Sequence, residues 1–471
     1  MRKACFIFVV FIVAVTFFVG DHLFFWDTVQ LASKHGHFFY ENNFSRLILP
    51  PEIDSGHLPA FGMYIAFCWK LFGKTLAVSH FAMLPFLLGI GYYVLKTGAY
   101  LVGEREAPWL LLFVFADPVL AGQSILVSPD IVLVFFFLMG LYALWVSPSR
   151  WLLALAVTGL GLTSMRGMMV ATGLFLFYFL CLGEKKSLNI FYKKIIPFVP
   201  GGLVAVAFLF YHWQQTGWVG YHAGSPWAPS YERVGWSGFL KNMVVLGWRL
   251  VDFGRVFEWM VLIFAGSLFF KNNKKLKGVV LQLGALMLII FIVTIPSQLL
   301  YKALLAHRYF LPLFLTIHTL LFYFIFKKTN KGIRAFNVPR VVLASVVVVG
   351  LISGNGWIYP KKISQGWDST LAHLPWYGLI ADAQKFLDEK KINYVDVGTG
   401  FPNIGRRELY ELDGRQYGFV QKDLRKNKYV LYSNIMNDFT DGEIDELEAN
   451  WSVVFQKEKR GVCLIIYRSK K

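Results

Sequence analysis

Charged side chains are scarce in this chain of 471 residues, in which Asp, Glu, Lys and Arg together make up 16%. Soluble globular domains usually carry about 25%. Hydrophobic residues account for 56%, aromatic residues for 17%, and the mean hydropathy is +0.50. This composition excludes an ordinary soluble enzyme and indicates a protein that crosses a membrane several times.

Cysteine is almost as rare. The four cysteines, Cys5, Cys68, Cys181 and Cys463, include no pair at C-x-x-C or metal-ligand spacing, so the sequence contains no thiol-based redox or zinc motif. We interpret them as small apolar side chains. A nucleotide-binding motif is missing as well, because the short run 398–400 (Gly-Thr-Gly) is more typical of a turn after a strand.

Negative charge is the less frequent sign, with 29 acidic residues against 47 basic ones and a formal net charge of +18. In a soluble chain this excess would favour nucleic-acid binding. Here the basic residues come in short runs between apolar segments, which is a signal of membrane topology. We therefore expect membrane lipids, and no nucleic acid, as partners.

Apolar segments that approach the length of a spanning helix, about 20 residues, occur along most of the chain. Arg2 and Lys3 precede the first, and Lys-rich runs follow the sixth, eighth and tenth. Since basic loops stay in the cytoplasm, the sequence predicts a cytoplasmic N-terminus and a C-terminus outside. The eleven predicted spans are residues 4–20, 76–97, 108–127, 131–146, 152–164, 168–182, 195–211, 250–270, 279–295, 309–326 and 341–359.

The first of these segments also has features of a signal peptide. Asp21 and His22 follow it without a small-x-small cleavage site, so we expect a retained signal anchor. The sequence contains neither long endomembrane-type loops nor a retention signal, so the expected location is a bacterial inner membrane.

The composition changes at Pro360, and residues 360–471 show the pattern of a soluble α/β domain. Periodicity predicts helices over 378–391 and 440–449, the second with a capping-type Thr and an acidic first turn. Strands are predicted over 393–397 and 429–432, and a closing hairpin over 451–455 and 462–467. Residues 1–359 then form the membrane core and 360–471 a second, extracytoplasmic domain.

An unusual concentration of ionisable groups lies in residues 21–75, directly after the first predicted span. Charge inside hydrocarbon costs several kcal/mol, so this segment must face water. Its aromatic residues suit short helices at the interface, with their apolar side in lipid. The apolar stretch 58–72 is expected to lie along the membrane. We interpret 21–75 as an outer catalytic loop.

Two aspartates carry most of the predicted chemistry. Asp27 follows Phe-Phe-Trp where the first span meets the outer surface, and a carboxylate beside apolar walls can act as a general base. The alternatives are a solvated loop residue or a helix cap. Asp130 begins the fourth span, where helix capping is an equal alternative. Together the two can position a substrate or a divalent metal. The nearby Glu52, Asp54 and His57 match no defined metal motif.

Four cationic candidates lie at the predicted outer ends of spans: Arg166, Lys302, His307 and Arg308. A guanidinium can bind a phosphate through two parallel hydrogen bonds. Interfacial snorkelling explains any one of them equally well. Their position on the same side as the acidic loop favours an anionic, lipid-carried ligand.

Five stretches, in this order, resemble the polyprenyl-phosphate-sugar glycosyltransferases of the C-type fold, most of all the protein mannosyltransferase and aminoarabinose lipid A transferase group. They cover roughly residues 1–330. Thr28 stands where a second acid is common in that family, His57-Leu58-Pro59 replaces Lys-Pro-Pro, and Arg166 replaces Lys. The stretches are WDTVQLA (26–32), GHLPAFGMYIAFCWKLFG (56–73), SPDIVLVFFFLMGLYAL (128–144), LTSMRG (162–167) and HRYFLPL (307–313).

The resemblance implies an all-α polytopic core that transfers a sugar from a polyprenyl-phosphate carrier to a protein, lipid or glycan acceptor on the outer face. The resemblance specifies no cofactor, and it leaves open a divalent metal on Asp27 and Asp130. The implied residues are Asp27 as base, Asp130 in support, and a substrate-binding set of His57, Arg166, His307, Arg308 and Tyr309. The alternatives are a lipid or glycan flippase and a structural assembly protein. A flippase is expected to carry charged residues within its spans, whereas the spans predicted here are nearly charge-free.

Overall fold

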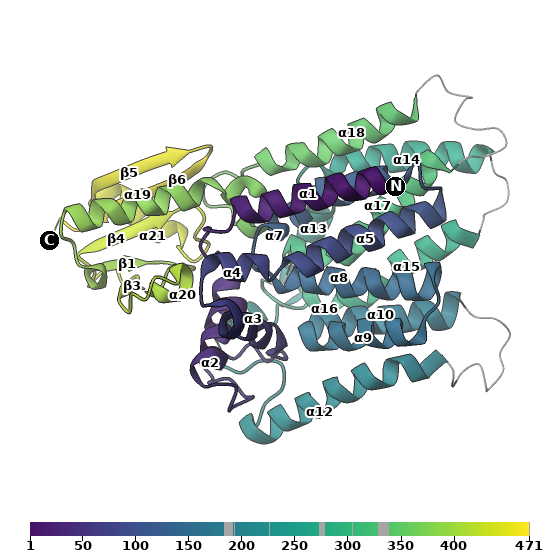
Figure 1. Cartoon of the computed structure of the whole chain (residues 1–471). Coiled ribbons are helices and arrows are strands. Elements are labelled where there is room, and N and C mark those ends of the chain that lie inside the picture. The colour runs from purple at the N-terminus through teal and green to yellow at the C-terminus, as the bar shows by residue number, and fades with distance from the viewer. Residues whose placement is uncertain are drawn as a thin grey trace.

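The computed structural model describes residues 1–182, 192, 194–225, 227–272, 278–303, 305–327 and 339–470. The charged runs predicted to be cytoplasmic at 184–186, 274–277 and 328–334 lie outside these residues, as does Lys193. A bundle of helices occupies most of the molecule, and a domain with a mixed sheet lies at one end of it (Figure 1). The N-terminus lies towards the opposite end of the bundle.

Every segment predicted to span the membrane contains a helix. Their starts follow local chemistry: the side chains of Ser128, Ser149 and Ser164 each accept a hydrogen bond from the first turn of the following helix. The helices are α1 (Arg2–Phe18), α4 (Leu76–Phe81) with α5 (Leu84–Leu101), α6 (Ala107–Ala116) with α7 (Pro118–Ser124), α8 (Pro129–Leu141) with η2 (Tyr142–Val146), α9 (Arg150–Thr163), α10 (Met165–Cys181), α12 (Val199–Thr216), α13 (Trp236–Val251) with α14 (Arg255–Asn272), α15 (Gly278–Thr294), α17 (Leu311–Phe326) and α18 (Arg340–Ser353).

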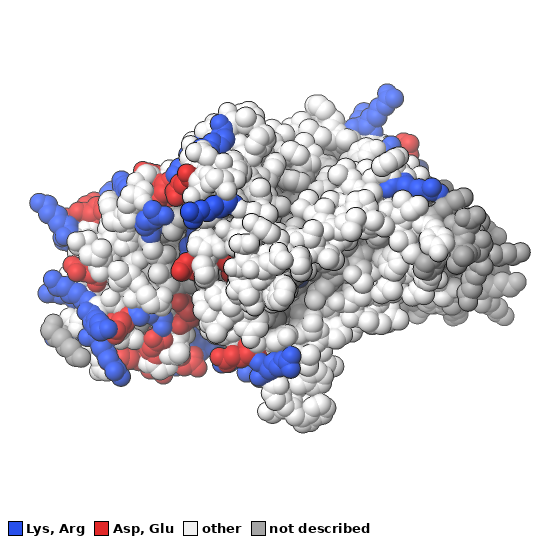
Figure 2. Space-filling model, turned by 90° about the horizontal axis from the view of Figure 1, so that it is seen from below, with Lys and Arg blue, Asp and Glu red and all other residues white. Residues whose placement is uncertain are grey.

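By length and composition, five helices among the described residues can cross a membrane, or seven if each of two bent pairs forms one span. The outer faces of the bundle expose large apolar side chains, such as Phe18 at 80% and Ile263 at 70%. Charged side chains gather over the sheet domain and are almost missing from the part of the bundle visible in Figure 2. An uncharged apolar surface of this kind is typical of a lipid-facing protein.

Two pairs of consecutive apolar helices meet at a sharp bend, and one ion pair joins the two breaks. The chain bends by 76° between α6 and α7 and by 77° between α13 and α14. Asp117 caps α7 through Val119 N at 2.9 Å, and it also accepts bonds from Arg255 Nη2 at 2.6 and 2.8 Å. His318 contacts both Asp117 and Glu258. The expectation of nearly charge-free spans was therefore wrong, because these residues, isolated in the sequence, form a buried cluster.

The C-terminal domain contains a six-stranded sheet in the order β2-β3-β1-β4-β6-β5. β1 is parallel to β3 and β4, and the other pairs are antiparallel. The strands are β1 (Val397–Thr399), β2 (Gly405–Arg406), β3 (Gly418–Gln421), β4 (Tyr429–Ser433), β5 (Ser452–Lys459) and β6 (Val462–Arg468). The helices of the domain are α19 (Pro375–Glu389), α20 (Glu408–Glu411) and α21 (Asp441–Asn450).

Most of the local predictions for this domain are confirmed. Helix α21 begins with a reciprocal capping box between Thr440 and Glu443, and the hairpin turns at Arg460 and Gly461, both at positive φ. The strand predicted over 393–397 was wrong at its start. The Asn393 side chain accepts a bond from Val395 N and holds a 3-10 turn, so that the strand begins only at Val397.

Residues 21–75, which the sequence predicts to be an outer loop, form short helices: η1 (Val29–Lys34), α2 (His35–Glu41) and α3 (Ala60–Phe72). Its aromatic residues were expected in lipid, yet Phe24 and Phe25 are buried in protein. The C-terminal domain covers this loop: Phe24 N donates to Tyr410 O at 3.0 Å, and Glu408 contacts Lys74 and His37. The two parts of the chain therefore share an interface at the outer loop.

Candidate active site

Asp27 projects from a tight turn between α1 and η1. Trp26 adopts φ 53°, a left-handed conformation that costs a non-glycine residue about 1–2 kcal/mol. The Thr28 side chain holds this turn, because its Oγ1 donates to Phe25 O at 2.7 Å and accepts from Phe25 N at 2.9 Å. Thr28, which replaces the second acid of the resembled family, thus has a local structural role.

Arg308 is the centre of the site. It belongs to a 3-10 turn, η5 (His307–Phe310), that leads into α17, and it is 7% exposed. Nη2 donates to Asp27 and Nη1 to Asp368, while Nε lies 3.5 Å from Asp130 Oδ2. Three carboxylates from distant parts of the chain therefore surround one guanidinium group.

A second arginine completes this arrangement. Arg166, near the start of α10, donates to Asp130 Oδ1 at 2.6 Å, and its guanidinium lies 4.0 Å from the centre of the Tyr309 ring. Asp130 is held in turn at the start of α8, where its backbone N donates to Ser128 Oγ at 3.1 Å. The two aspartates and two arginines predicted from the sequence thus converge. A carboxylate held between two guanidinium groups orients both of them.

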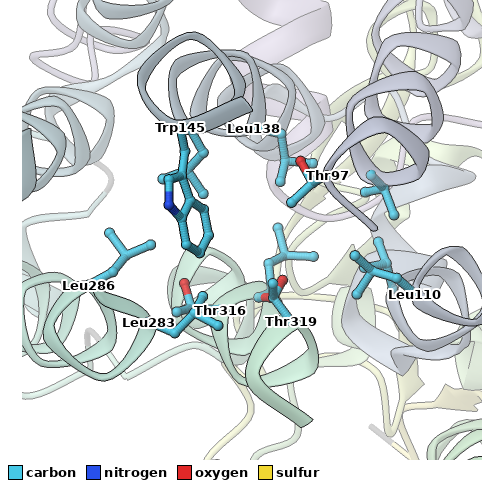
Figure 3. A pocket seen from close by; sticks show the side chains of 12 residues that line it. Thr97, Leu110, Leu138, Trp145, Leu283, Leu286, Thr316 and Thr319 are labelled. Carbon is cyan, nitrogen blue, oxygen red and sulfur yellow. The ribbon is translucent and has the colours of Figure 1, made fainter. Parts of the chain in front are cut away.

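A narrow pocket opens beside these groups. Asp130, Arg166, Arg308 and Tyr309 form its polar wall, together with Gln298. A separate apolar pocket lies further along the same helices, lined by residues of α8, α15 and α17 with α5, α6 and η2, and Figure 3 shows Trp145, Leu286 and Thr316 pointing into it. A charged pocket and an apolar one therefore follow each other along three helices.

His57 lines another pocket with His35 and Ser55, and Arg166 lines both this pocket and the first one. Burial, and next the nearby Arg166, lower the pKa of His57 to about 4. Its ring is therefore neutral at pH 7. Ser55 Oγ and His57 Nδ1 are buried and have no hydrogen-bond partner among the described residues, so both remain available to a ligand.

The other cationic candidates lie apart from the pocket. His307 is completely buried; its Nε2 is 3.0 Å from Asp252 Oδ2, and its ring packs against Phe253. Lys302 keeps 64% of its side chain exposed and bonds to Glu232. His307 therefore has the contacts of a structural side chain, and Lys302 forms an ion pair at the surface.

The segment between α12 and α13 also reaches the site. Tyr231, at the end of η4 (Ala228–Tyr231), lies close enough to Tyr309 and Arg166 for both to influence its pKa, which burial raises. This loop is fixed to the segment before η5, since Val234 N donates to Leu300 O and Lys302 N to Glu232 O, both at 3.0 Å. This segment therefore brings Tyr231 near Arg166 and Tyr309.

A divalent metal does not fit the site as it stands. Among the residues that the structure describes, no group of three His, Cys, Asp or Glu side chains is placed to hold a metal ion. Asp27 and Asp130 direct their oxygens to guanidinium groups. We therefore derive no step of the chemistry through a metal.

Sequence reasoning missed Asp368. It lies in a 3-10 turn, η8 (Trp367–Ser369), and is 2% exposed. Its backbone O accepts a bond from Gln123 Nε2 at 2.8 Å, which fixes the turn against α7. Burial raises its pKa, and the carboxylates of Asp27 and Asp130 act in the same direction, against Arg308. One signal was present: Trp367-Asp368-Ser369 has the same pattern as Trp26-Asp27-Thr28.

No protein-family model and no curated protein sequence matches the chain. Two solved structures do, both of ArnT from Cupriavidus metallidurans. The crystal structure bound to undecaprenyl phosphate has a TM-score of 0.52 and 12% identity, and the match covers 98% of this chain and 97% of that one. The apo structure has a TM-score of 0.50 and 13% identity over the same shares. The chain therefore has the ArnT fold over nearly its whole length, which confirms the fold expected from the motifs.

Proposed function

We propose that this protein is a membrane glycosyltransferase that moves a sugar from a polyprenyl-phosphate carrier to an acceptor on the outer face. The observation that carries the proposal is the pocket where Arg166, Arg308 and Tyr309 meet Asp130, with Asp27 on the far side of Arg308. The ArnT structure with the same fold was solved with undecaprenyl phosphate bound. A lipid-linked phosphate is therefore the ligand class that we assign to the pocket.

The chemistry needs few groups. An acceptor oxygen or nitrogen attacks the anomeric carbon of the sugar, and the bond from that carbon to the phosphate oxygen breaks. The phosphate keeps the bonding electrons and gains one negative charge. Arg166 and Arg308 stabilise that charge, because charge-assisted hydrogen bonds are strong in a buried site. The acceptor proton goes to a carboxylate.

Asp27 is our choice for this base. Its side chain is 21% exposed, and among the described residues neither the pocket of Arg308 nor that of His57 includes it. An acceptor can therefore reach Asp27 from the surface while the phosphate approaches Arg308 from the pocket. Asp130 is assigned a supporting role, in which it orients Arg166 and Arg308. The neutral His57 and Ser55 are assigned to hydroxyl groups of the sugar.

The apolar pocket supports a lipid carrier. Leu133 of α8 and Pro312 of α17 line the charged pocket, and Leu138 and Thr316 of the same helices line the apolar one. With a rise of about 1.5 Å per residue, these positions are about 6–8 Å apart along the helix axes. An isoprenoid chain attached to the phosphate would thus find apolar surface within one or two helical turns.

For the orientation we propose the eleven-span topology, with the N-terminus in the cytoplasm and the C-terminal domain outside in a bacterial inner membrane. A reporter that is active only outside should work when fused after Tyr359 and fail when fused after Lys327. Both positions flank α18. The reverse pattern would place Asp27 on the cytoplasmic side and exclude the proposed outer-face reaction.

The phosphate assignment is tested by replacing the arginines. Arg166→Ala and Arg308→Ala should each weaken the binding of undecaprenyl phosphate about tenfold or more, which corresponds to about 1.4 kcal/mol, the low end for losing a charge-assisted hydrogen bond. Lys302→Ala, which removes an exposed cation outside the pocket, is the matched control. If wild type and the three variants bind undecaprenyl phosphate with equal affinity, the arginines do not bind the phosphate and act as membrane anchors.

A flippase is the second candidate, favoured by the buried ionisable cluster of Asp117, Arg255, Glu258 and His318. Such groups within spans often mark transport pathways. In this chain, however, Asp117 bonds to both Arg255 and His318, and its pair with Arg255 joins two helix breaks. Purified protein in detergent, where there are no two sides to transport between, separates the candidates. A transferase should still release polyprenyl phosphate from a lipid-linked sugar when an acceptor is present.

A further inference from the structure

Arg308 contacts more carboxylates than we expect for the guanidinium group of an unoccupied phosphate-binding site. Asp27, Asp130 and Asp368 touch its Nη2, Nε and Nη1. The Arg308 side chain is 8% exposed, and those of Asp130 and Asp368 are 6% and 3% exposed. With Arg166 included, the carboxylates exceed the guanidinium groups by one charge. A phosphate that enters this site must therefore compete with one of the three carboxylates.

The three carboxylates are not equally replaceable. Asp130 has a second cation, because Arg166 donates to its other oxygen at 2.6 Å. The Asp27 side chain is 21% exposed, so solvent screens the interaction of its charge with Arg308. Asp368 is buried, and Arg308 is the one cation that it contacts among the described residues. Its charge therefore acts on Arg308 with the least screening.

We propose that Asp368 is a positioning residue that occupies Arg308 in the empty enzyme as a counter-charge, and that it sets the affinity of the site for the lipid phosphate. This inference rests on the proposed function. The donor is a phosphodiester with one negative charge, whereas the product is a phosphomonoester that can carry two. A resident carboxylate opposes the product more strongly than the donor, and it returns to Arg308 as polyprenyl phosphate departs.

The position of Asp368 in the fold supports this assignment. Its segment is fixed, since a Cβ added at Gly122 of α7 would lie 2.8 Å from Thr370 N and 3.0 Å from Asp368 O. The Ser369 hydroxyl, which donates to Asp368 Oδ1 at 3.4 Å, can still stabilise this carboxylate when Arg308 turns to the phosphate. The C-terminal domain thus supplies a charged group to the centre of the membrane core's site.

Asp368→Asn in the full-length protein tests the proposal. The substitution removes the charge of the side chain and keeps its shape. Undecaprenyl phosphate should then bind at least about tenfold more tightly, because a like charge within a few ångströms of the phosphate is gone. The gain should appear as a lower KM for the donor and a lower kcat, limited by product release. A merely structural role predicts weaker binding instead. Asp368→Glu should restore an affinity close to wild type.

The control is Asp382→Asn, the same change in an exposed acid of the same domain that pairs with Lys457, and it should leave binding unchanged. Wild-type binding with no gain in Asp368→Asn would overturn the inference and leave the proposed function intact. Failure of wild type to bind undecaprenyl phosphate would remove both.

If Asp368→Asn does not fold, a measurement on the wild-type protein tests the proposal instead. Addition of undecaprenyl phosphate should increase amide hydrogen exchange at residues 367–369, because Asp368 loses its contact with Arg308. Unchanged or slower exchange in this turn on saturation with the lipid would contradict the proposal.

Discussion

Asp27→Asn should reduce sugar transfer at least a hundredfold and leave the protein folded and able to bind undecaprenyl phosphate. The substitution keeps the size of the side chain and one acceptor oxygen but removes the group that takes the proton. Loss of a general base typically costs about 10²–10⁴-fold in rate. Because Thr28, and not Asp27, holds the turn at Trp26, the local backbone should survive the change.

Phosphate binding should be retained in this variant, since Arg308 loses a competing carboxylate and keeps its own charge. The measurement therefore has two readouts: lipid-phosphate affinity at or above the wild-type value, and transfer close to background. Asp130→Asn serves as the comparison. Near wild-type transfer in Asp27→Asn with an inactive Asp130→Asn would move the role of base to Asp130, and activity in both variants would exclude a carboxylate mechanism.

Much of the site followed from topology. Asp27, Asp130, Arg166 and Arg308 each stand at a predicted outer end of a span, and such ends lie at one surface of a bundle. Membrane topology thus brings together Asp27 and Arg308, which are 281 positions apart. Hydropathy and basic runs are strong signals, because the bilayer restricts which segments can be buried.

Side-chain direction did not follow from the sequence. His307 and Arg308 are neighbours, yet Arg308 enters the pocket wall and His307 contacts Asp252. They lie in a 3-10 turn, where successive side chains point about 120° apart. A motif that includes both residues cannot tell which one faces the ligand. Similarly, the sequence does not give the burial that keeps His57 neutral.

The contribution of the C-terminal domain to the site could not be predicted from the sequence either. Compositional change at Pro360 predicts a second domain, and its helices and hairpin follow from periodicity and capping. Where that domain docks depends on tertiary contacts, such as Phe24 N to Tyr410 O and Gln123 Nε2 to Asp368 O. No local pattern encodes these pairs, so the aromatic residues of the outer loop were assigned to lipid and Asp368 was not considered.

The largest effect on stability is expected from Asp117→Asn. Asp117 and Arg255 are 1% and 0% exposed, and their ion pair joins the breaks of two bent spans. Removal of one partner leaves the other charge buried without compensation, which typically costs about 3–5 kcal/mol. Because Asn can still cap α7 through its oxygen, the loss reports on the charge and not on the cap. Unfolding in detergent should therefore begin at a clearly lower denaturant concentration.

Arg255→Met should also be less stable than wild type, because Asp117 loses both bonds from Arg255 and retains His318 as its cationic contact. The double variant Asp117→Leu with Arg255→Met supplies the control, since exchanging a whole buried pair for apolar side chains is often neutral or stabilising. We expect it to be more stable than either single variant. Single variants that unfold like wild type would show that the ion pair contributes little to stability.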